Sequence, residues 1–366
     1  RSPSGRYVRV IAVIEFLAGL MLAALTLRDV FGTVVVPGES RGFLRVARRV
    51  VRLTLPLERR LRPRGHGLAL GFAPAALVAS FVIWMALLGL GFGLMGHALR
   101  NSFEPATTSL PQAIYVASSA LVTIGLSETE ATGPARWLTL AAGFCGLAVM
   151  TMAVTYLLEV QGSVAQRDTG VLKLTTTAGQ PPSGLALLER VSRLGRRTEL
   201  PRILRESRDW CAAVQQSHAA HPSLIYFRSL PGDTGWPAAL GAVLDAALML
   251  ELLVDDAEAR GAATLLREQG ERLAGEMSTL IGLEVRPGAP SVSQDLQAVR
   301  RRLRAAGYAL VPAGDTDRDF LRLRAPSAAC VAALSNHLGM PCPPLAPAPP
   351  DGAEADAAQQ IGRAHV

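Results

Sequence analysis

The sequence predicts an all-α membrane protein with three transmembrane helices, a short re-entrant segment and a helical cytosolic domain. No charged residue occurs from Gly65 to Leu99 or from Trp137 to Leu158. Each of these stretches supplies the ~20 apolar residues that a bilayer-spanning helix needs. The chain is 49% hydrophobic, yet 37 of its residues are Lys or Arg. This combination indicates a membrane part joined to a soluble part rather than one globular domain.

The first apolar run extends from Val10 to Leu27, and residues 1–38 are expected to form an N-terminal transmembrane anchor helix. No small-x-small cleavage site follows the run, so an anchor is favoured over a signal peptide. Glu15 and Asp29 are costly in lipid and should face protein, water or a basic partner. The alternative is that both lie near the membrane interfaces, which is at least as good an explanation for Asp29.

Residues 39–67 form a basic segment that is expected to lie in the cytoplasm. Nine arginines occur between residues 41 and 66, with Glu58 as the one acid among them, and such density beside a membrane span marks the cytoplasmic side. Apolar residues recur there at helical spacing: Phe43, Val46, Val50 and Leu53. This spacing predicts an amphipathic helix that is attracted by anionic lipids of the inner leaflet. Topology already explains the charge, so nucleic-acid binding is disfavoured.

The cytoplasmic position of the basic segment sets the orientation of the remaining spans. An outer helix at 68–98 would lead outward and an inner helix at 136–160 would return. The chain is then a multi-pass protein of the cell (plasma) membrane with a cytoplasmic C-terminal domain. Between these helices, residues 111–121 are predicted to form a short helix. Pro111 suits its first turn, because the missing N–H would have no partner there.

The short helix is followed by Thr123, Ile124, Gly125, Leu126, Ser127 and Glu128. The order of helix, re-entrant segment, Thr-x-Gly, acid and helix resembles the pore module of the potassium channel superfamily, in particular bacterial single-pore ion channels. The filter of that family reads Thr-Val-Gly-Tyr-Gly-Asp. The resemblance covers residues 68–161 and implies a pore helix and filter at 111–128. Leu126 and Ser127 depart from the family's Tyr and second Gly.

The resemblance also implies residue roles. The selectivity filter would comprise Thr123, Ile124, Gly125, Leu126 and Ser127, with Glu128 at the outer mouth and Ser118 and Ser119 supporting the filter from the pore helix. Potassium would bind transiently to backbone carbonyls of Thr123, Ile124 and Gly125 and to the Thr hydroxyl. Such a filter requires an extended strand, which β-branched residues stiffen and Gly permits. Because Leu126 lacks a hydroxyl and Ser127 carries a Cβ, the outer ion sites and potassium selectivity are in question.

The family's inner helix often bends at a glycine, which implies Gly143 or Gly146 as a gating hinge. Close packing of small residues is the alternative. One pore segment per chain implies a homotetramer. The expected function is a tetrameric cation channel subunit that conducts potassium passively, with no enzyme activity, catalytic residue or cofactor. The alternative is a non-conducting membrane-anchored sensor or scaffold. An intramembrane hydrolase using Ser118 or Ser119 with His97 is disfavoured, because no Gly-x-Ser-x-Gly motif is present.

Residues 162–340 are predicted to form an α-helical cytosolic domain of unknown ligand or partner. A helical face begins at Leu185, and amphipathic helices are expected at 201–219, 236–257, 259–281, 294–307 and 316–337. His218 and His221 are a weak zinc pair. An acidic cluster could bind calcium or form a solvated helix face: Asp255, Asp256 and Glu258.

Both ends of the chain look atypical in the sequence. Residues 341–366 are rich in Pro, Ala and Asp and are expected to be a disordered tail. Residues 361–366 resemble read-through of a sequencing adapter, and the chain does not begin with Met, so Arg1 is not expected to be the natural start.

Overall fold

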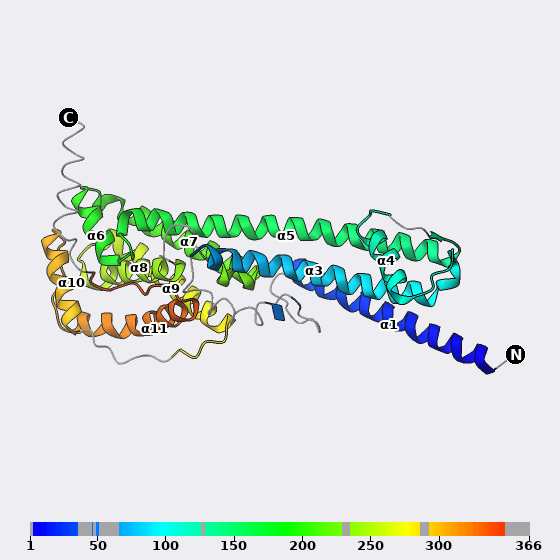
Figure 1. Ribbon diagram of the computed structural model, residues 1–366. Helices are drawn as coiled ribbons and strands as arrows, with labels where there is room; N and C mark the ends of the chain where they lie inside the picture. Colours follow the sequence, from blue (N-terminus) through cyan, green and yellow to red (C-terminus); the bar gives the residue numbers. More distant parts are fainter. Residues whose placement is uncertain are drawn as a thin grey trace, which may run out of the picture. The chain divides into compact units, whose positions relative to one another are not determined.

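The chain folds almost entirely into α-helices, as the computed structural model in Figure 1 shows. The structure describes residues 3–35, 46, 49–50, 66–125, 129–228, 235–285 and 293–347. These residues belong to two compact units. The first unit holds Arg1–Gly162 and Ala219–Phe227, and the second holds Ser163–His218 and Arg228–Val366.

Four helices in the described part of the chain are long and apolar enough to cross a membrane. They lie at Arg9–Val34 in α1 (Pro3–Val34), Ala73–Ala98 in α3 (His66–Ala98), α5 (Pro134–Ala178) and Trp236–Leu253. The first three contain the predicted spans, and α5 continues past the predicted end at residue 160. The fourth was not among the predicted spans, and 89% of its apolar window is buried by protein, against 17% in α1 and α5. A helix enclosed by protein has no face left for lipid, so the fourth is a core helix. The fold is that of a helical protein with several long apolar helices, as expected of a membrane protein.

Two acidic residues of α1 contact polar partners on α3. The Glu15 carboxylate lies 2.7 Å from His97 Nδ1, and both side chains are about four-fifths buried. Asp29 is 3% exposed, and its Oδ2 accepts a hydrogen bond of 2.9 Å from Trp84 Nε1. Burying a carboxylate is costly unless hydrogen bonds compensate it. The expectation that both acids face protein partners is confirmed, and a position of Asp29 near the membrane interface stays a prediction.

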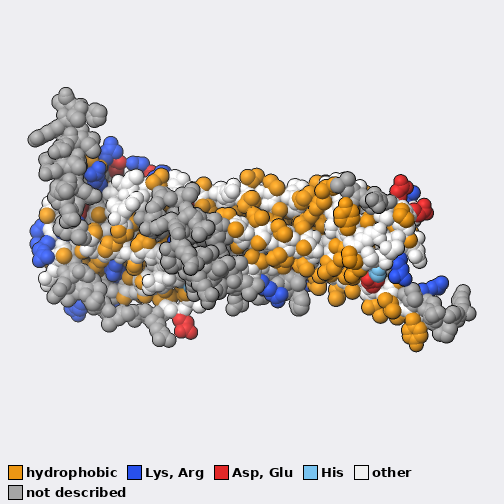
Figure 2. All heavy atoms as spheres, viewed as in Figure 1, with side chains coloured by type: hydrophobic (Ala, Val, Ile, Leu, Met, Phe, Trp, Pro, Cys, Tyr) orange, Lys and Arg blue, Asp and Glu red, His pale blue; other side chains and the backbone are white. Residues whose placement is uncertain are grey.

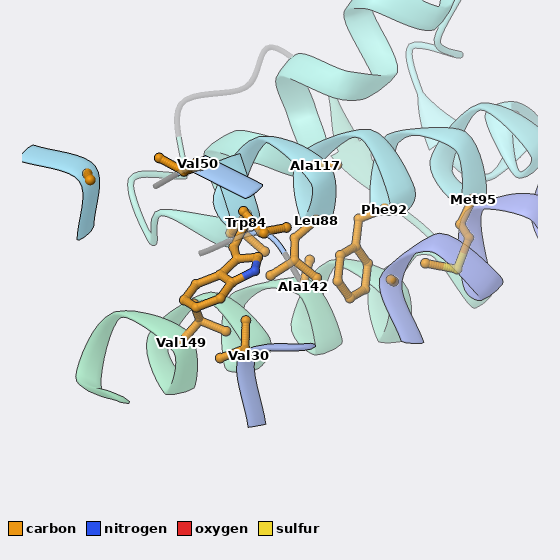
Figure 3. Packing of buried hydrophobic residues seen from close by; sticks show 13 residues of the cluster. Val30, Val50, Trp84, Leu88, Phe92, Met95, Ala117, Ala142 and Val149 are labelled. Atoms are coloured by element: carbon orange, nitrogen blue, oxygen red, sulfur yellow. The ribbon is translucent and has the colours of Figure 1, made fainter. Parts of the chain in front are cut away.

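Glycine allows α1 and α3 to approach closely between these two contacts. A Cβ added to Gly19 would lie 2.5 Å from the carbonyl oxygen of Gly91, a distance that no larger residue tolerates. Small residues at a helix crossing are the usual device for close packing in membrane proteins. Around this crossing, α1, α3, α4 and α5 enclose one apolar cluster, in which Trp84, Leu88 and Phe92 of α3 are at most 5% exposed (Figure 3).

A two-stranded ladder closes the segment between α3 and α5. Strand β1 (Phe103–Glu104) follows the 3-10 helix η2 (Arg100–Ser102), and it pairs antiparallel with β2 (Glu130–Ala131). Phe103 is buried against Val116 of α4 and Ala135 of α5. The ladder therefore joins the two ends of the loop that carries α4 (Leu110–Leu121).

The second unit is a helical bundle around one buried helix. Its elements are the end of α5, α6 (Gly184–Arg193), η3 (Arg197–Glu199), α7 (Leu200–Ala220), α8 (Trp236–Leu248), the π-helix η5 (Met249–Leu253), α9 (Ala257–Leu280), α10 (Ser293–Ala305) and α11 (Asp315–Leu338). Helix α8 contacts α6, α9 and α11, and all of its residues are buried. The helices were predicted close to these positions, but an amphipathic helix over 236–257 is wrong, because α8 has no solvated face.

The tail begins later than predicted. Residues 341–347 are described, and Leu345 is only 6% exposed. Arg302 donates a hydrogen bond to the carbonyl of Pro347. The first part of the expected disordered tail is therefore packed against the second unit, while residues 348–366 lie outside the described residues.

Candidate functional site

Helix α4 starts where the sequence places a helix-starting signal. The Ser109 side chain accepts a hydrogen bond from the Gln112 backbone N–H, and Pro111 lies in the first turn. The Gln112 side-chain oxygen accepts in return from the backbone N–H and the hydroxyl of Thr108. These bonds satisfy groups that a helix start leaves without partners. The predicted helix at 111–121 is confirmed as α4.

The backbone after α4 turns its N–H groups back onto the last turn of the helix. Thr123 N donates to Ala120 O at 3.0 Å, and Ile124 N and Gly125 N donate to Ser119 O at 3.0 and 3.3 Å. In a trans peptide the carbonyl points opposite to the N–H of the same unit. The carbonyls of Val122, Thr123 and Ile124 therefore all point away from α4, whereas successive carbonyls of a β-strand alternate in direction.

This arrangement depends on left-handed backbone at two positions. The φ angles are 59° at Thr123 and 70° at Gly125, with Ile124 between them outside this region. The prediction of an extended strand is therefore wrong for Thr123. A β-branched residue with positive φ is rare, and such strain of about 1–3 kcal/mol collects at functional sites. A helix C-cap uses the same left-handed conformation, but Gly or Asn usually occupies it.

The turn is open to its surroundings in a single chain. Thr123, Ile124 and Gly125 are exposed, with Ile124 at 61%. A Cβ added to Gly125 would meet no described atom within 4 Å. An exposed Ile beside outward-facing carbonyls is suited to a surface that other protein or lipid covers. The other three residues of the predicted filter and mouth, Leu126, Ser127 and Glu128, lie outside the described residues.

The two serines predicted to support the filter have different surroundings. The Ser118 hydroxyl packs against Gly89 of α3, where an added Cβ would lie 2.6 Å from it. Ser119 is 7% exposed and supplies the carbonyl that accepts from both Ile124 and Gly125. Its hydroxyl has no hydrogen-bond partner among the described residues. The Ser119 backbone therefore supports the turn directly.

Both predicted hinge glycines lie against the end of α4. A Cβ added to Gly146 would be 1.7 Å from the carbonyl oxygen of Leu121, and one added to Gly143 would be 3.3 Å from that of Ala120. The close-packing alternative thus describes their surroundings. Helix α5 runs unbroken through both positions, and a bend at either one remains a prediction.

Sequence reasoning missed the glycines of α3 that hold α4 in place. Gly89 and Gly93 lie four residues apart, and a Cβ added to Gly93 would be 2.6 Å from Cγ1 of Ile114. Gly91, between them, faces α1 instead. The Gly-Leu-Gly-Phe-Gly sequence at 89–93 contains the small-xxx-small spacing that marks a helix contact, so the signal was present.

A pair of glutamates in the ladder was also missed. Glu104 and Glu130 face each other across the ladder, and both are exposed. Like charges directly opposite in an antiparallel pair repel each other.

The basic segment contacts the first unit through Asp29. Val46 donates its backbone N–H to Asp29 Oδ2 at 3.1 Å, so the same oxygen serves both Val46 and Trp84. Val46 and Val50 are buried in the apolar cluster, and Arg49 is exposed. Buried apolar and exposed basic residues at this spacing agree with the amphipathic pattern. The other residues of 39–65 lie outside the described residues.

The metal-ligand candidates of the cytosolic half have other partners. His218 donates from Nδ1 to Val214 O at 2.8 Å and packs on Trp236, and burial lowers its pKa to about 3, with a smaller contribution from Arg167. His221 belongs to the other compact unit. In the described ranges no group of three His, Cys, Asp or Glu could hold a metal ion. Asp256 is the N-cap of α9, where its carboxylate accepts from two backbone N–H groups, and Asp255 and Glu258 are exposed, in agreement with a solvated helix face.

The disfavoured hydrolase interpretation finds no geometric support at His97, whose Nδ1 faces Glu15 rather than Ser118 or Ser119. No family model matches the chain, and neither a curated protein nor a solved structure matches it. A function for this chain therefore has to be inferred from the geometry of α4 and of the turn that follows it.

Proposed function

We propose that the chain is the subunit of a tetrameric cation channel that conducts potassium passively across the cell membrane. One observation carries the proposal: the N–H groups of Thr123, Ile124 and Gly125 all bond back to α4, which turns consecutive carbonyls to one side. A filter that replaces the hydration shell of a cation needs consecutive carbonyls on one side. The C-terminal end of α4 adds partial negative charge at the same place.

The surroundings of the turn support a pore module. Helices α3 and α5 flank α4 and are apolar over a membrane-spanning length. Figure 2 shows hydrophobic side chains covering this part of the first unit. Along α5, exposed apolar residues recur at intervals of three, four or seven positions: Trp137, Leu140, Phe144, Leu147, Val154 and Leu158. Such a stripe would face further copies of α5 in a tetramer, with one filter segment from each copy.

Potassium would bind transiently to the carbonyls of Thr123 and Ile124, which point away from α4, and also to the Gly125 carbonyl and the Thr123 hydroxyl. The predicted outer residues Leu126, Ser127 and Glu128 would complete the passage. The inner end of the module would face the cytoplasm, because the basic segment 39–67 belongs there. Its arginines would contact anionic lipid of the inner leaflet.

Purified protein in liposomes provides the test, with potassium and sodium compared as the carried ion. Gly125→Ala should lower the potassium flux at least tenfold, because a Cβ opposes the left-handed backbone at φ 70°. Gly133→Ala is the matched control, since Gly133 also has positive φ (49°) and no described atom within 4 Å of an added Cβ. It should change the flux less than twofold.

Three outcomes would contradict the proposal. Absence of flux from the wild type in every ion would favour the non-conducting scaffold. Equal loss of flux in both variants would attribute the effect to backbone strain alone. Unchanged flux in Gly125→Ala would show that conduction does not depend on this turn.

A further inference from the structure

The first compact unit includes a short segment from much later in the sequence. Residues 219–227, called here the η4 strap, contain the last residues of α7 and the 3-10 helix η4 (Pro222–Tyr226). The chain on both sides of the strap, up to His218 and from Arg228, belongs to the second unit. Any movement of the second unit therefore reaches the strap through two covalent connections.

The η4 strap contacts α5 through His221. This side chain is 5% exposed, and its ring meets the edge of the Tyr156 ring with centroids 5.1 Å apart and an interplanar angle of 84°. Its Nε2 lies 3.2 Å from a carboxylate oxygen of Glu159, one turn farther along α5. Edge-to-face aromatic pairs hold a defined geometry and add stabilisation beyond the area that they bury.

From Tyr156 the ring contacts continue into the rest of the first unit. Phe81 of α3 lies 6.2 Å from Tyr156 and 5.3 Å from Trp84, and both pairs are edge-to-face. Trp84 in turn donates to Asp29 of α1. The strap thus rests on a row of aromatic contacts that joins α5 to α3 and that a hydrogen bond continues to α1.

Tyr156 lies well away from the place where α5 contacts α4, so a displacement of Tyr156 can tilt the helix. Gly146 fixes α5 against the end of α4 by backbone contact, and Tyr156 lies ten residues farther along the same helix, or about 15 Å at the usual rise. Displacement of α5 at Tyr156 would tilt it about the contact at Gly146. That contact is with Leu121, two residues before Thr123.

We propose that the η4 strap positions the inner end of α5, with Tyr156 and His221 as positioning residues, and that the second unit regulates conduction through this contact. The inference rests on the proposed function. The strap holds the side of α5 opposite its exposed stripe, so a shift of the strap moves the stripe relative to the other subunits and changes the width of the inner passage.

Flux measurements on the full chain in liposomes test the regulation. Tyr156→Ala and His221→Ala should each change the potassium flux at least about threefold, and the double variant should change it no further than the larger single effect, because both act on one contact. Tyr156→Phe keeps the ring, so this variant should have wild-type flux, unlike Tyr156→Ala. Tyr7→Ala is the matched control, since Tyr7 is 73% exposed on α1. Wild-type flux in both alanine variants, or effects that multiply, would overturn the proposal.

Hydrogen exchange gives a readout that does not require conduction. His221→Ala should accelerate exchange of the α5 amides between residues 150 and 162 at least about threefold and leave α4 unchanged, while His221→Phe should not. If the wild type carries no ion, the proposed function fails, and this measurement alone decides whether the strap positions α5. Unchanged exchange in His221→Ala overturns the proposal that the η4 strap positions α5, whether or not the protein conducts.

Discussion

Replacing Gly146 by Ala tests the contact between α5 and α4 that supports the candidate filter. The new Cβ would lie 1.7 Å from the Leu121 carbonyl oxygen and 2.6 Å from its carbonyl carbon. Ordinary contact needs about 3.4 Å, so the helices would have to separate by well over 1 Å. Overpacking of this kind typically costs about 1–3 kcal/mol, against a gain of about 1 kcal/mol when Ala replaces Gly within a helix. We expect a net loss of stability of up to about 2 kcal/mol.

Two other glycines of α5 provide a graded comparison. Gly162 has no described atom within 4 Å of an added Cβ, and Gly143 has one contact of 3.3 Å. Gly162→Ala should stabilise the protein by about 1 kcal/mol, and Gly143→Ala should fall between Gly162→Ala and Gly146→Ala. Thermal unfolding of the detergent-solubilised protein measures the order, and potassium flux reports whether the displaced helix disturbs conduction.

The order of stability of the three variants shows whether α5 contacts the backbone of Leu121. If Gly146→Ala were as stable as Gly162→Ala, the backbone contact between α5 and Leu121 could not exist in the folded protein. The support that we assign to the turn at Thr123 would then be lost. If Gly146→Ala lost stability but kept full flux, the contact would be structural only.

Three further substitutions test buried polar groups. Trp84→Phe removes one hydrogen-bond donor from the buried Asp29 carboxylate and should cost about 1–3 kcal/mol of unfolding free energy, measured by thermal unfolding. Arg324→Ala removes the bidentate partner of Asp245 (2.7 and 3.0 Å) and should cost about 3–5 kcal/mol in chemical denaturation, whereas replacing both residues by Leu should cost much less. Burial lowers the pKa of His218 to about 3 from 6.5, so the unfolded state binds the extra proton between these pH values. Stability should therefore fall with decreasing pH by up to about 1.4 kcal/mol per unit, and His218→Phe should flatten that slope.

Each of these has an outcome that would contradict it. Undiminished stability in Trp84→Phe would mean that Asp29 does not depend on the indole. A double Leu variant as unstable as Arg324→Ala would indicate lost packing rather than an exposed charge. A pH slope that survives His218→Phe would place the titrating group elsewhere.

Local signals in the sequence predicted the helices well. The start of α4 follows from Pro111, and the long apolar helices follow from uncharged stretches of sufficient length, because helix-start signals and hydrophobic runs act within a few neighbouring residues. The pattern could not show that α8 is enclosed on every side, since an apolar run of that length suits lipid and protein interior equally. Nor could it show that Thr123 adopts a left-handed conformation, which its own preferences oppose.

The sequence by itself determined where most of the helices lie, which stretches are apolar enough for a membrane, and the Thr-Ile-Gly order after α4. Tertiary structure alone decided which surfaces meet. It placed Trp84 on Asp29, Gly146 on the end of α4 and His221 on Tyr156, residues far apart along the chain. Their pairing depends on the packing of whole helices against one another, and no local preference encodes it.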